Sequence, residues 1–380
     1  MTTRSEPGEG VVSDPVTLLY SEVEEELRAA VRGLLADRCP PAAVLRRIES
    51  EPDRRELLNS VNSVNSVYDL DLWKTLAGEI GVAGLLIPEQ YGGAGASASE
   101  AAVVLEELGR GVAPVPFFTS SVLATRALLP TGSESGGALL EELAEGRKTA
   151  ALAVPFAASP YRAGAAVRLE DGRLTGTVGG VAGADVADVL LVPVDGRLHA
   201  VEGGALVQVV PSLDQTRPVA TVTFDGAEAR DVGACDLAEV LRFGAGLLAS
   251  EQLGVAEWCL DTTLGHVRER HQFARPIGSF QAIKHRLADL WLDVVRARAA
   301  ARSAATDGSA LSVAVAQSWN AGVAVHAAEE ALQLHGGIGM TWEHPVHLYL
   351  KRAKAAEIAL GTPGDHRAAL ASLVDVPGPE

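Results

Sequence analysis

Two segments in the C-terminal third of the chain carry residue types that contact phosphate groups. The first is Arg270-His-Gln-Phe-Ala-Arg-Pro-Ile-Gly-Ser-Phe-Gln281, and the second is Gln333-Leu-His-Gly-Gly-Ile-Gly339. A guanidinium group pairs with phosphate oxygens through parallel hydrogen bonds, and paired glycines let backbone N–H groups approach a ligand closely. The alternative for Arg270 is an ordinary ion pair at the end of a surface helix.

Two other patterns in the sequence predict no site. His344 and His347 flank Pro345, but no Cys or carboxylate stands at metal-ligand spacing from them, so we predict no metal site. Gly244-Ala-Gly246 is not a GxGxxG motif that follows a strand, and it therefore predicts no Rossmann-type dinucleotide site.

The composition is that of a soluble globular protein, with 47% hydrophobic and 21% charged residues in 380. The net charge of −17 argues against nucleic acid or an anionic membrane as the main partner, because both bind basic patches. Cys39, Cys235 and Cys259 form no CxxC motif, which favours a reduced, cytoplasmic setting. Residues 1–15 carry no signal-peptide pattern, and no run of about 18 apolar residues predicts a membrane span.

The residue pattern divides the chain into four parts and predicts an α+β fold. We expect a disordered lead-in at residues 1–15, an N-terminal helical domain at 16–146, a middle β domain at 147–235, and a C-terminal helical domain at 236–380.

The middle and C-terminal parts have distinct periodicities. Short β-type runs separated by turns such as Asp171-Gly172 and Asp195-Gly196 predict a compact β barrel or sandwich. In the C-terminal part, apolar residues step by three and four along one stripe, as packing in a helix bundle requires. The stripe consists of Phe280, Ile283, Leu287, Leu290 and Val294.

Four segments together resemble the acyl-CoA dehydrogenase family, flavoproteins that desaturate acyl thioesters. Besides the two C-terminal segments, Gly84-Leu-Leu-Ile-Pro-Glu-Gln-Tyr-Gly-Gly-Ala-Gly95 is similar to a helix-to-loop segment of the family, and Leu105-Glu-Glu-Leu-Gly109 follows it as expected. Their order and spacing cover most of the chain. The resemblance implies an N-terminal helical domain, a middle β barrel and a C-terminal four-helix bundle.

The resemblance also implies a cofactor and its contacts. In the family, a base removes the α-proton of an acyl-CoA thioester and the β-hydride passes to FAD, which lies across a subunit boundary. The resemblance places six residues at the pyrophosphate and adenosine end of a neighbouring subunit's FAD: Arg270, Gln272, Phe273, Gln333, Gly336 and Gly337.

The chain departs from the family where the flavin ring and the base are expected. The family's Thr-Glu-Pro loop is matched here by Ala153-Val-Pro-Phe-Ala-Ala-Ser-Pro-Tyr161, in which only Pro155 is kept. The usual catalytic glutamate precedes a Gly-Thr pair, and that position is Leu360. A minority of the family carries the glutamate on the first long helix of the bundle, at a position matched here by Gly244. Neither residue can accept a proton.

Glu251 is the remaining acid of interest. It lies seven residues after Gly244 on the same predicted helix, which places it on a similar face but about 10 Å further along the axis. Three roles are open for it: a buried polar core residue, an interface contact, or a relocated base.

The sequence therefore favours a subunit that completes the FAD site of a homologous partner chain within a tetramer, with the partner supplying the catalytic glutamate. Such an assembly would desaturate an acyl-CoA with a bulky acyl group and pass electrons to an electron-transfer flavoprotein or another acceptor. Two alternatives remain: a flavin-dependent oxygenase or oxidase on the same fold, and a non-catalytic acyl-CoA-binding subunit.

Overall fold

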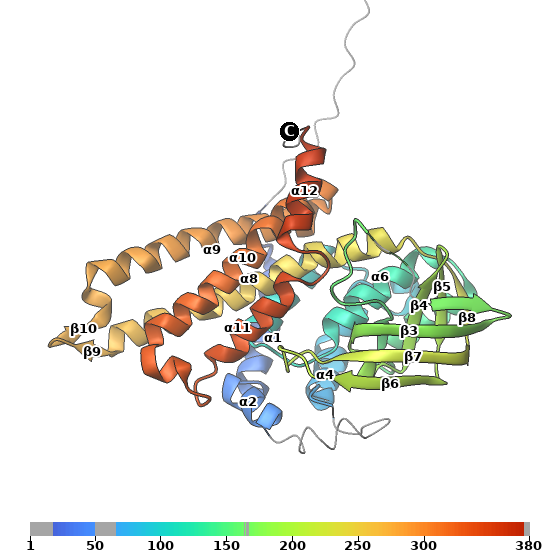
Figure 1. The fold of residues 1–380 in the computed structure, drawn as a ribbon, viewed down its shortest axis with the longest axis horizontal. Helices are drawn as coiled ribbons and strands as arrows, with labels where there is room; N and C mark the ends of the chain where they lie inside the picture. Colours follow the sequence, from blue (N-terminus) through green and yellow to red (C-terminus); the bar gives the residue numbers. More distant parts are fainter. Residues whose placement is uncertain (1–17, 50–65, 163, 165–166, 376–380) are drawn as a thin grey trace, which may run out of the picture.

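The computed structural model describes residues 18–49, 66–162, 164 and 167–375 (Figure 1). The lead-in predicted for residues 1–15 lies outside this part. Helices precede and follow a β region, which confirms the α–β–α order. No helix in the described part is both long enough and apolar enough to cross a membrane.

The N-terminal part consists of short and medium helices. Serine caps start two of them, since Ser21 and Ser97 each form a capping box with the glutamate three residues later. The α-helices are α1 (Glu22–Arg38), α2 (Pro41–Glu49), α4 (Leu70–Thr75), α5 (Ala98–Arg110), α6 (Thr125–Leu128) and α7 (Glu134–Ala144). The π-helices are η1 (Leu76–Ile80) and η4 (Phe117–Ala124), and the 3₁₀ turns are η2 (Val82–Gly84), η3 (Glu89–Tyr91) and η5 (Leu129–Thr131).

The described residues of the middle part form eight strands and one 3₁₀ turn. They are β1 (Ala150–Leu152), β2 (Val167–Glu170), β3 (Arg173–Ala182), η6 (Ala184–Val186), β4 (Val189–Val194), β5 (Arg197–Val201), β6 (Ala205–Val210), β7 (Val219–Glu228) and β8 (Arg230–Ala234). The predicted turns at Asp171-Gly172 and Asp195-Gly196 connect antiparallel pairs β2–β3 and β4–β5, with all four residues at positive φ. This is the backbone of a type I′ hairpin turn.

The strands do not close into the barrel that the resemblance implied; of the two arrangements that the sequence pattern predicted, a barrel or a sandwich, they form the sandwich. They form two four-stranded sheets, ordered β1-β4-β5-β8 and β2-β3-β7-β6, with apolar side chains such as Val192, Val222 and Phe224 packed in one cluster between them. Helical elements cover edges that a barrel would pair, because β1 packs on η4 and β8 on α7. The expected barrel is therefore corrected to two packed sheets.

The C-terminal part is a bundle of long helices with a two-stranded hairpin at one end (Figure 1). Its elements are α8 (Leu237–Glu269), β9 (His271–Gln272), β10 (Arg275–Pro276), η7 (Ile277–Ser279), α9 (Gln281–Asp307), α10 (Ala310–His335), η8 (Gly336–Met340), α11 (Val346–Glu357) and α12 (Pro363–Leu373). Leu287, Leu290 and Val294 of the predicted apolar stripe are buried.

Helix α8 joins the N-terminal helices to the bundle through an unusually close contact with α5. A Cβ atom on Gly254 would lie 1.9 Å from the Glu106 carbonyl oxygen, and one on Gly109 would lie 2.2 Å from the Glu251 carbonyl oxygen. Only glycine permits this approach of two helix backbones.

We predict that Gly254→Ala destabilises the protein by about 3 kcal/mol or more, because the new methyl group would overlap backbone. Gly265→Ala on the same helix is the matched control. A Cβ there meets no atom within 4 Å, so alanine should raise stability by about 0.5–1 kcal/mol through helix propensity. Chemical denaturation measures both, and equal effects would show that the α5–α8 contact is not close-packed.

Candidate functional site

The two positions at which the resemblance places a base lie next to each other. Gly244 is on α8 and Leu360 lies shortly before α12, and both are buried. A Cβ atom on Gly244 would lie 3.0 Å from Leu360 Cδ1 and 2.4 Å from Leu123 Cδ2. Leu123 comes from the π-helix η4. The side chains of Leu123 and of Leu360 itself therefore fill the space beside Gly244.

The loop of residues 153–161 is hydrogen-bonded to the segment that holds Leu360. The Leu360 N–H donates to the Phe156 carbonyl at 2.9 Å, and the Leu360 carbonyl lies 3.1 Å from His366 Nε2. Tyr161 Oη lies 2.9 Å from His366 Nδ1. Because burial lowers the pKa of His366, the neutral ring donates from Nε2 to Leu360 and accepts from Tyr161. Several polar groups of this loop therefore bond within the chain.

Glu251 is held by two buried arginines. Its carboxylate pairs with Arg217, which precedes β7, and lies 3.3 Å from Arg352 on α11. Arg352 also lies 2.8 Å from Asp214. Burial alone would raise the pKa of Glu251, but the charges of Arg217 and Arg352 outweigh it and lower the pKa. An ionised, doubly paired carboxylate of lowered pKa is a weak proton acceptor.

Arg217 links this charge cluster to the loop of residues 153–161. Its guanidinium carbon lies 5.2 Å from the ring centroid of Phe156 and 5.3 Å from that of Phe118. The two rings meet edge to face with centroids 6.0 Å apart. The sequence analysis missed Arg217, although the segment Asp214-Gln-Thr-Arg217 places opposite charges within an otherwise apolar region.

The first predicted FAD-contact segment forms an exposed hairpin after α8. Arg270 and Gln272 are exposed, and Phe273 is 87% exposed. Phe273 and Ala274 form the turn with φ of 53° and 59°, a left-handed backbone that non-glycine residues seldom adopt. Arg275 folds back with its guanidinium carbon 3.8 Å from the Phe280 ring centroid.

The second predicted segment begins where α10 ends. Gly336 has φ 61° and ψ −134°, and a Cβ atom on Gly336 or Gly337 would meet no atom within 4 Å. Gln333, Gly336 and Gly337 are exposed. Their amide and backbone groups can therefore reach a ligand held by another chain.

A histidine contact joins the helix end that precedes the first segment to the second segment. His266 lies four residues before Arg270, and His335 lies directly before Gly336. Their rings stack with centroids 4.4 Å apart. We call residues 270–281 and 333–340 together the arm. A guanidinium, two amides and the N–H groups of open glycines fit a diphosphate, so the arm suits the pyrophosphate end of FAD.

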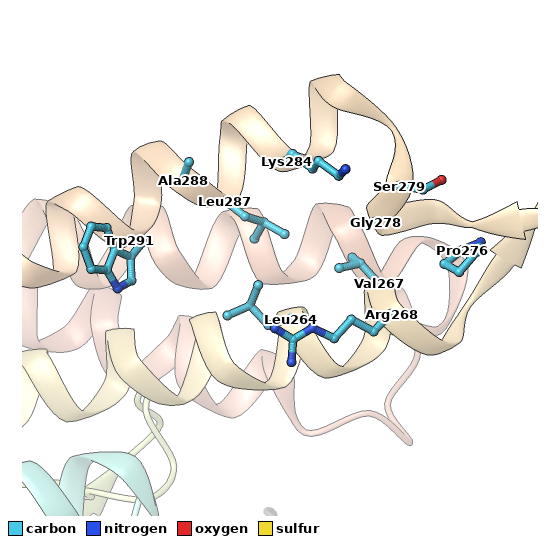
Figure 2. A pocket seen from close by; sticks show the side chains of 10 residues that line it. All are labelled: Leu264, Val267, Arg268, Pro276, Gly278, Ser279, Lys284, Leu287, Ala288 and Trp291. Atoms are coloured by element: carbon cyan, nitrogen blue, oxygen red, sulfur yellow. The ribbon is translucent and has the colours of Figure 1, made fainter.

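A separate cavity of about 550 Å³ lies between α8 and α9 beside the hairpin (Figure 2). Leu264, Leu287 and Trp291 line its apolar wall, with Arg268 and Lys284 as its basic residues. Leu264 lies 20 residues after Gly244 on α8, which is about 30 Å along the axis. The cavity is therefore remote from the two base positions.

No group of three or more potential metal ligands occurs in the described part of the chain. His344 and His347, considered as ligands from the sequence, contact aromatic rings: the His344 ring is tilted against His335, and the His347 ring stacks on Trp342.

Comparison with known proteins identifies both helical parts. Residues 21–147 match the acyl-CoA dehydrogenase N-terminal domain, and residues 233–373 match the acyl-CoA dehydrogenase C-terminal domain. The chain is 37% identical over 346 residues to the acyl-CoA dehydrogenase IpdE2 of Mycolicibacterium smegmatis. The aligned residues cover 90% of this chain and 96% of that protein.

Two solved structures are similar over nearly the whole chain. The ChsE4–ChsE5 complex from Mycobacterium tuberculosis aligns with a TM-score of 0.79 and 31% identity, over 95% of this chain and 100% of that one. The Tcur3481–Tcur3483 steroid ACAD aligns with a TM-score of 0.76 and 29% identity, over 93% of this chain and 98% of that one.

We predict that Glu251→Gln destabilises the protein by about 3–5 kcal/mol, because it leaves two buried guanidinium groups short of negative charge. Glu257→Gln is the matched control on α8. Its pair with the part-exposed Arg298 should contribute less than about 1 kcal/mol.

The pH dependence of this effect has a defined sign. Since the folded-state pKa of Glu251 is lowered, its contribution is present above the ordinary pKa of 4.5 and is lost as the pH falls through the lowered value. The denaturation free energies of the wild type and Glu251→Gln should therefore converge in acid. A constant difference down to low pH would contradict the ion-pair account.

We predict that Leu360→Glu costs about 3 kcal/mol or more and yields no acyl-CoA dehydrogenation by the isolated chain, because the glutamate would be buried against leucines. Leu360→Met, which conserves volume, should cost less than about 1.5 kcal/mol. Turnover by Leu360→Glu alone would show that the chain needs nothing but a base.

Proposed function

The chain belongs to the acyl-CoA dehydrogenase family, and on that premise we propose that it completes the FAD site of a partner chain in a heteromeric enzyme. The assembly desaturates an acyl-CoA thioester, and the partner chain supplies the catalytic glutamate. One observation carries the proposal: Gly244 and Leu360 meet in a space filled by leucines, while the arm stays exposed.

FAD is the cofactor of this family, and the arm is the part of this chain that fits it. When bound, FAD accepts the hydride that leaves the β-carbon of the acyl group. Arg270 and Gln272 would contact the pyrophosphate and Phe273 the adenosine end. Gln333, Gly336 and Gly337 would contact the same region from the end of α10. We assign no such role to the chain's own loop at residues 153–161, because it keeps only Pro155 of the family's Thr-Glu-Pro and its backbone bonds to the segment that holds Leu360.

Exposed apolar side chains on the bundle support an oligomer. Large apolar residues remain exposed along two neighbouring helices, α9 and α10, which is unusual on a monomer surface. They are Trp291, Leu292, Leu311, Val315 and Trp319. A homologous chain that buries them would also bring its FAD to the arm.

The relatives support a heteromeric assembly and a bulky substrate. ChsE4–ChsE5 is a complex of two chains, and the Tcur3481–Tcur3483 protein is a steroid ACAD. We accordingly assign a steroid-like acyl-CoA as the substrate class, a cytoplasmic location, and an electron-transfer flavoprotein or similar acceptor.

Purification of the tagged chain from its native host tests the assembly. We expect a homologous chain with a glutamate at either base position to co-purify, and acyl-CoA-dependent reduction of an artificial acceptor to require both chains. Full turnover by this chain alone, as a homo-oligomer, would overturn the proposal.

A substitution in the arm tests the cofactor contact. In the two-chain assembly, Arg270→Ala should lower FAD affinity by about tenfold, because a charge-assisted contact to phosphate contributes about 1.5–3 kcal/mol. Arg173→Ala removes another exposed arginine, one that pairs with Glu228 in the β region, and should leave FAD affinity unchanged. Equal FAD affinity of the two variants would show that Arg270 does not contact FAD.

A further inference from the structure

Three imidazole rings are in contact at the base of the arm: the rings of His266 and His335 stack, and the His344 ring is tilted by 46° against that of His335. His335 lies between the other two, with its ring centroid 4.4 Å from that of His266 and 4.4 Å from that of His344. His335 is 6% exposed, and the other two are half-buried. We call these residues the histidine stack.

Each ring comes from a different element, and only His335 belongs to the arm itself. His266 is in the last turn of α8, and its carbonyl accepts the Arg270 N–H at 2.8 Å. His335 is the last residue of α10 before Gly336, and His344 precedes α11. The contact between His266 and His335 therefore ties the helix end that carries one half of the arm to the start of the other half.

Hydrogen bonds fix the orientation of two rings in their neutral form. His335 Nδ1–H donates to the Ala331 carbonyl at 2.7 Å, and His344 Nδ1 accepts from the Val346 N–H at 3.3 Å. An added proton on His344 Nδ1 would face the Val346 N–H and break that bond. Charging two adjacent rings would also place like charges face to face.

The charged and titratable groups around the histidine stack do not stabilise a positive charge on its rings. Glu269 favours the charged form of His266, but Arg270 opposes it. His347 opposes the charged form of His344, and His347 itself lies near Lys351 and Glu49. Burial lowers the pKa of His266, His335 and His344, the last to about 4. All three rings are therefore neutral at pH 7.

We propose that the histidine stack positions the two halves of the arm for the FAD pyrophosphate, and that protonation of the stack separates them and releases FAD. His266, His335 and His344 are then positioning residues, which act through Arg270 and Gly336–Gly337. The inference rests on the proposed function, because it assigns a regulation to the same arm.

The sign of the pH effect follows from the lowered pKa values. Unfolded or separated histidines titrate near 6.5, so the stacked arrangement loses stability as the pH falls below 6.5 and continues to lose it down to the lowered values. Above 6.5 it is unaffected.

Hydrogen–deuterium exchange of the chain tests the stack without FAD. The measured exchange rates are corrected for the pH dependence of intrinsic amide exchange. In the wild type, the amides of the arm should then lose protection between about pH 7.5 and about pH 5. His335→Phe keeps a flat ring that takes no charge, and its arm should stay protected at both pH values. His335→Ala should lose protection at both. His326→Phe, at an exposed position of the same helix, should behave as the wild type.

Flavin fluorescence of the two-chain assembly supplies the second measurement. His335→Ala should weaken FAD binding at neutral pH by roughly fivefold or more. His335→Phe should bind FAD with little change between the two pH values, whereas the wild type releases it in acid. Amide protection within α8 and α10 serves as the folding check for every variant.

The outcomes separate the two proposals. An assembly that binds no FAD at the arm contradicts the proposed function. In that case the hydrogen–deuterium exchange experiment still tests whether the histidine stack holds the arm together. Arm protection in the wild type that does not change with pH, or an identical acid response in His335→Phe, overturns the inference.

Discussion

The ionised carboxylate of Glu251 is the contact on which the placement of the other elements depends. It lies on α8 and pairs with Arg217 from the β region and Arg352 from α11, while its backbone packs against Gly109 of α5. Separating the β region or α11 from α8 would take a buried charge away from its partner, at a cost of several kcal/mol. The first half of α8 is therefore fixed in three directions. Its far end carries Arg270 about 30 Å further along the axis.

The region around Leu360 keeps the backbone of a catalytic loop without its acceptor. Leu360 has φ 52° and Gly361 has φ 97°, and a left-handed leucine costs about 1–2 kcal/mol. The hydrogen bonds to Phe156 and His366 hold this conformation. Burial of the Leu360 side chain against Gly244 offsets the strain, which a buried, unpaired glutamate could not do.

The sequence predicted the element order and the hairpin turns, because both depend on local spacing or on glycine. Strand β3 contains three glycines, which weaken a strand signal, although the strand pairs on both sides. The sequence pattern left a barrel and a sandwich open, since strand spacing does not show which edges helices cover, and the barrel came from the resemblance. The histidine stack and Arg217 were missed because their partners lie on elements distant in the sequence, so only the packed structure reveals them.

The arm is harder to explain by folding than any buried part of the chain. Phe273 and Ala274 adopt left-handed backbone at a cost of order 1 kcal/mol each, and Phe273 buries almost nothing in return. Arg270 is exposed beside them. The β9–β10 pairing and an edge-to-face contact of Phe273 with Phe280, centroids 6.1 Å apart, offset part of this strain from within the chain. The Phe273 ring nevertheless stays solvent-exposed, beside the exposed Arg270. Strained backbone is thus found both in this exposed turn and at the buried Leu360, and in each place hydrogen bonds or packing from the rest of the chain hold it.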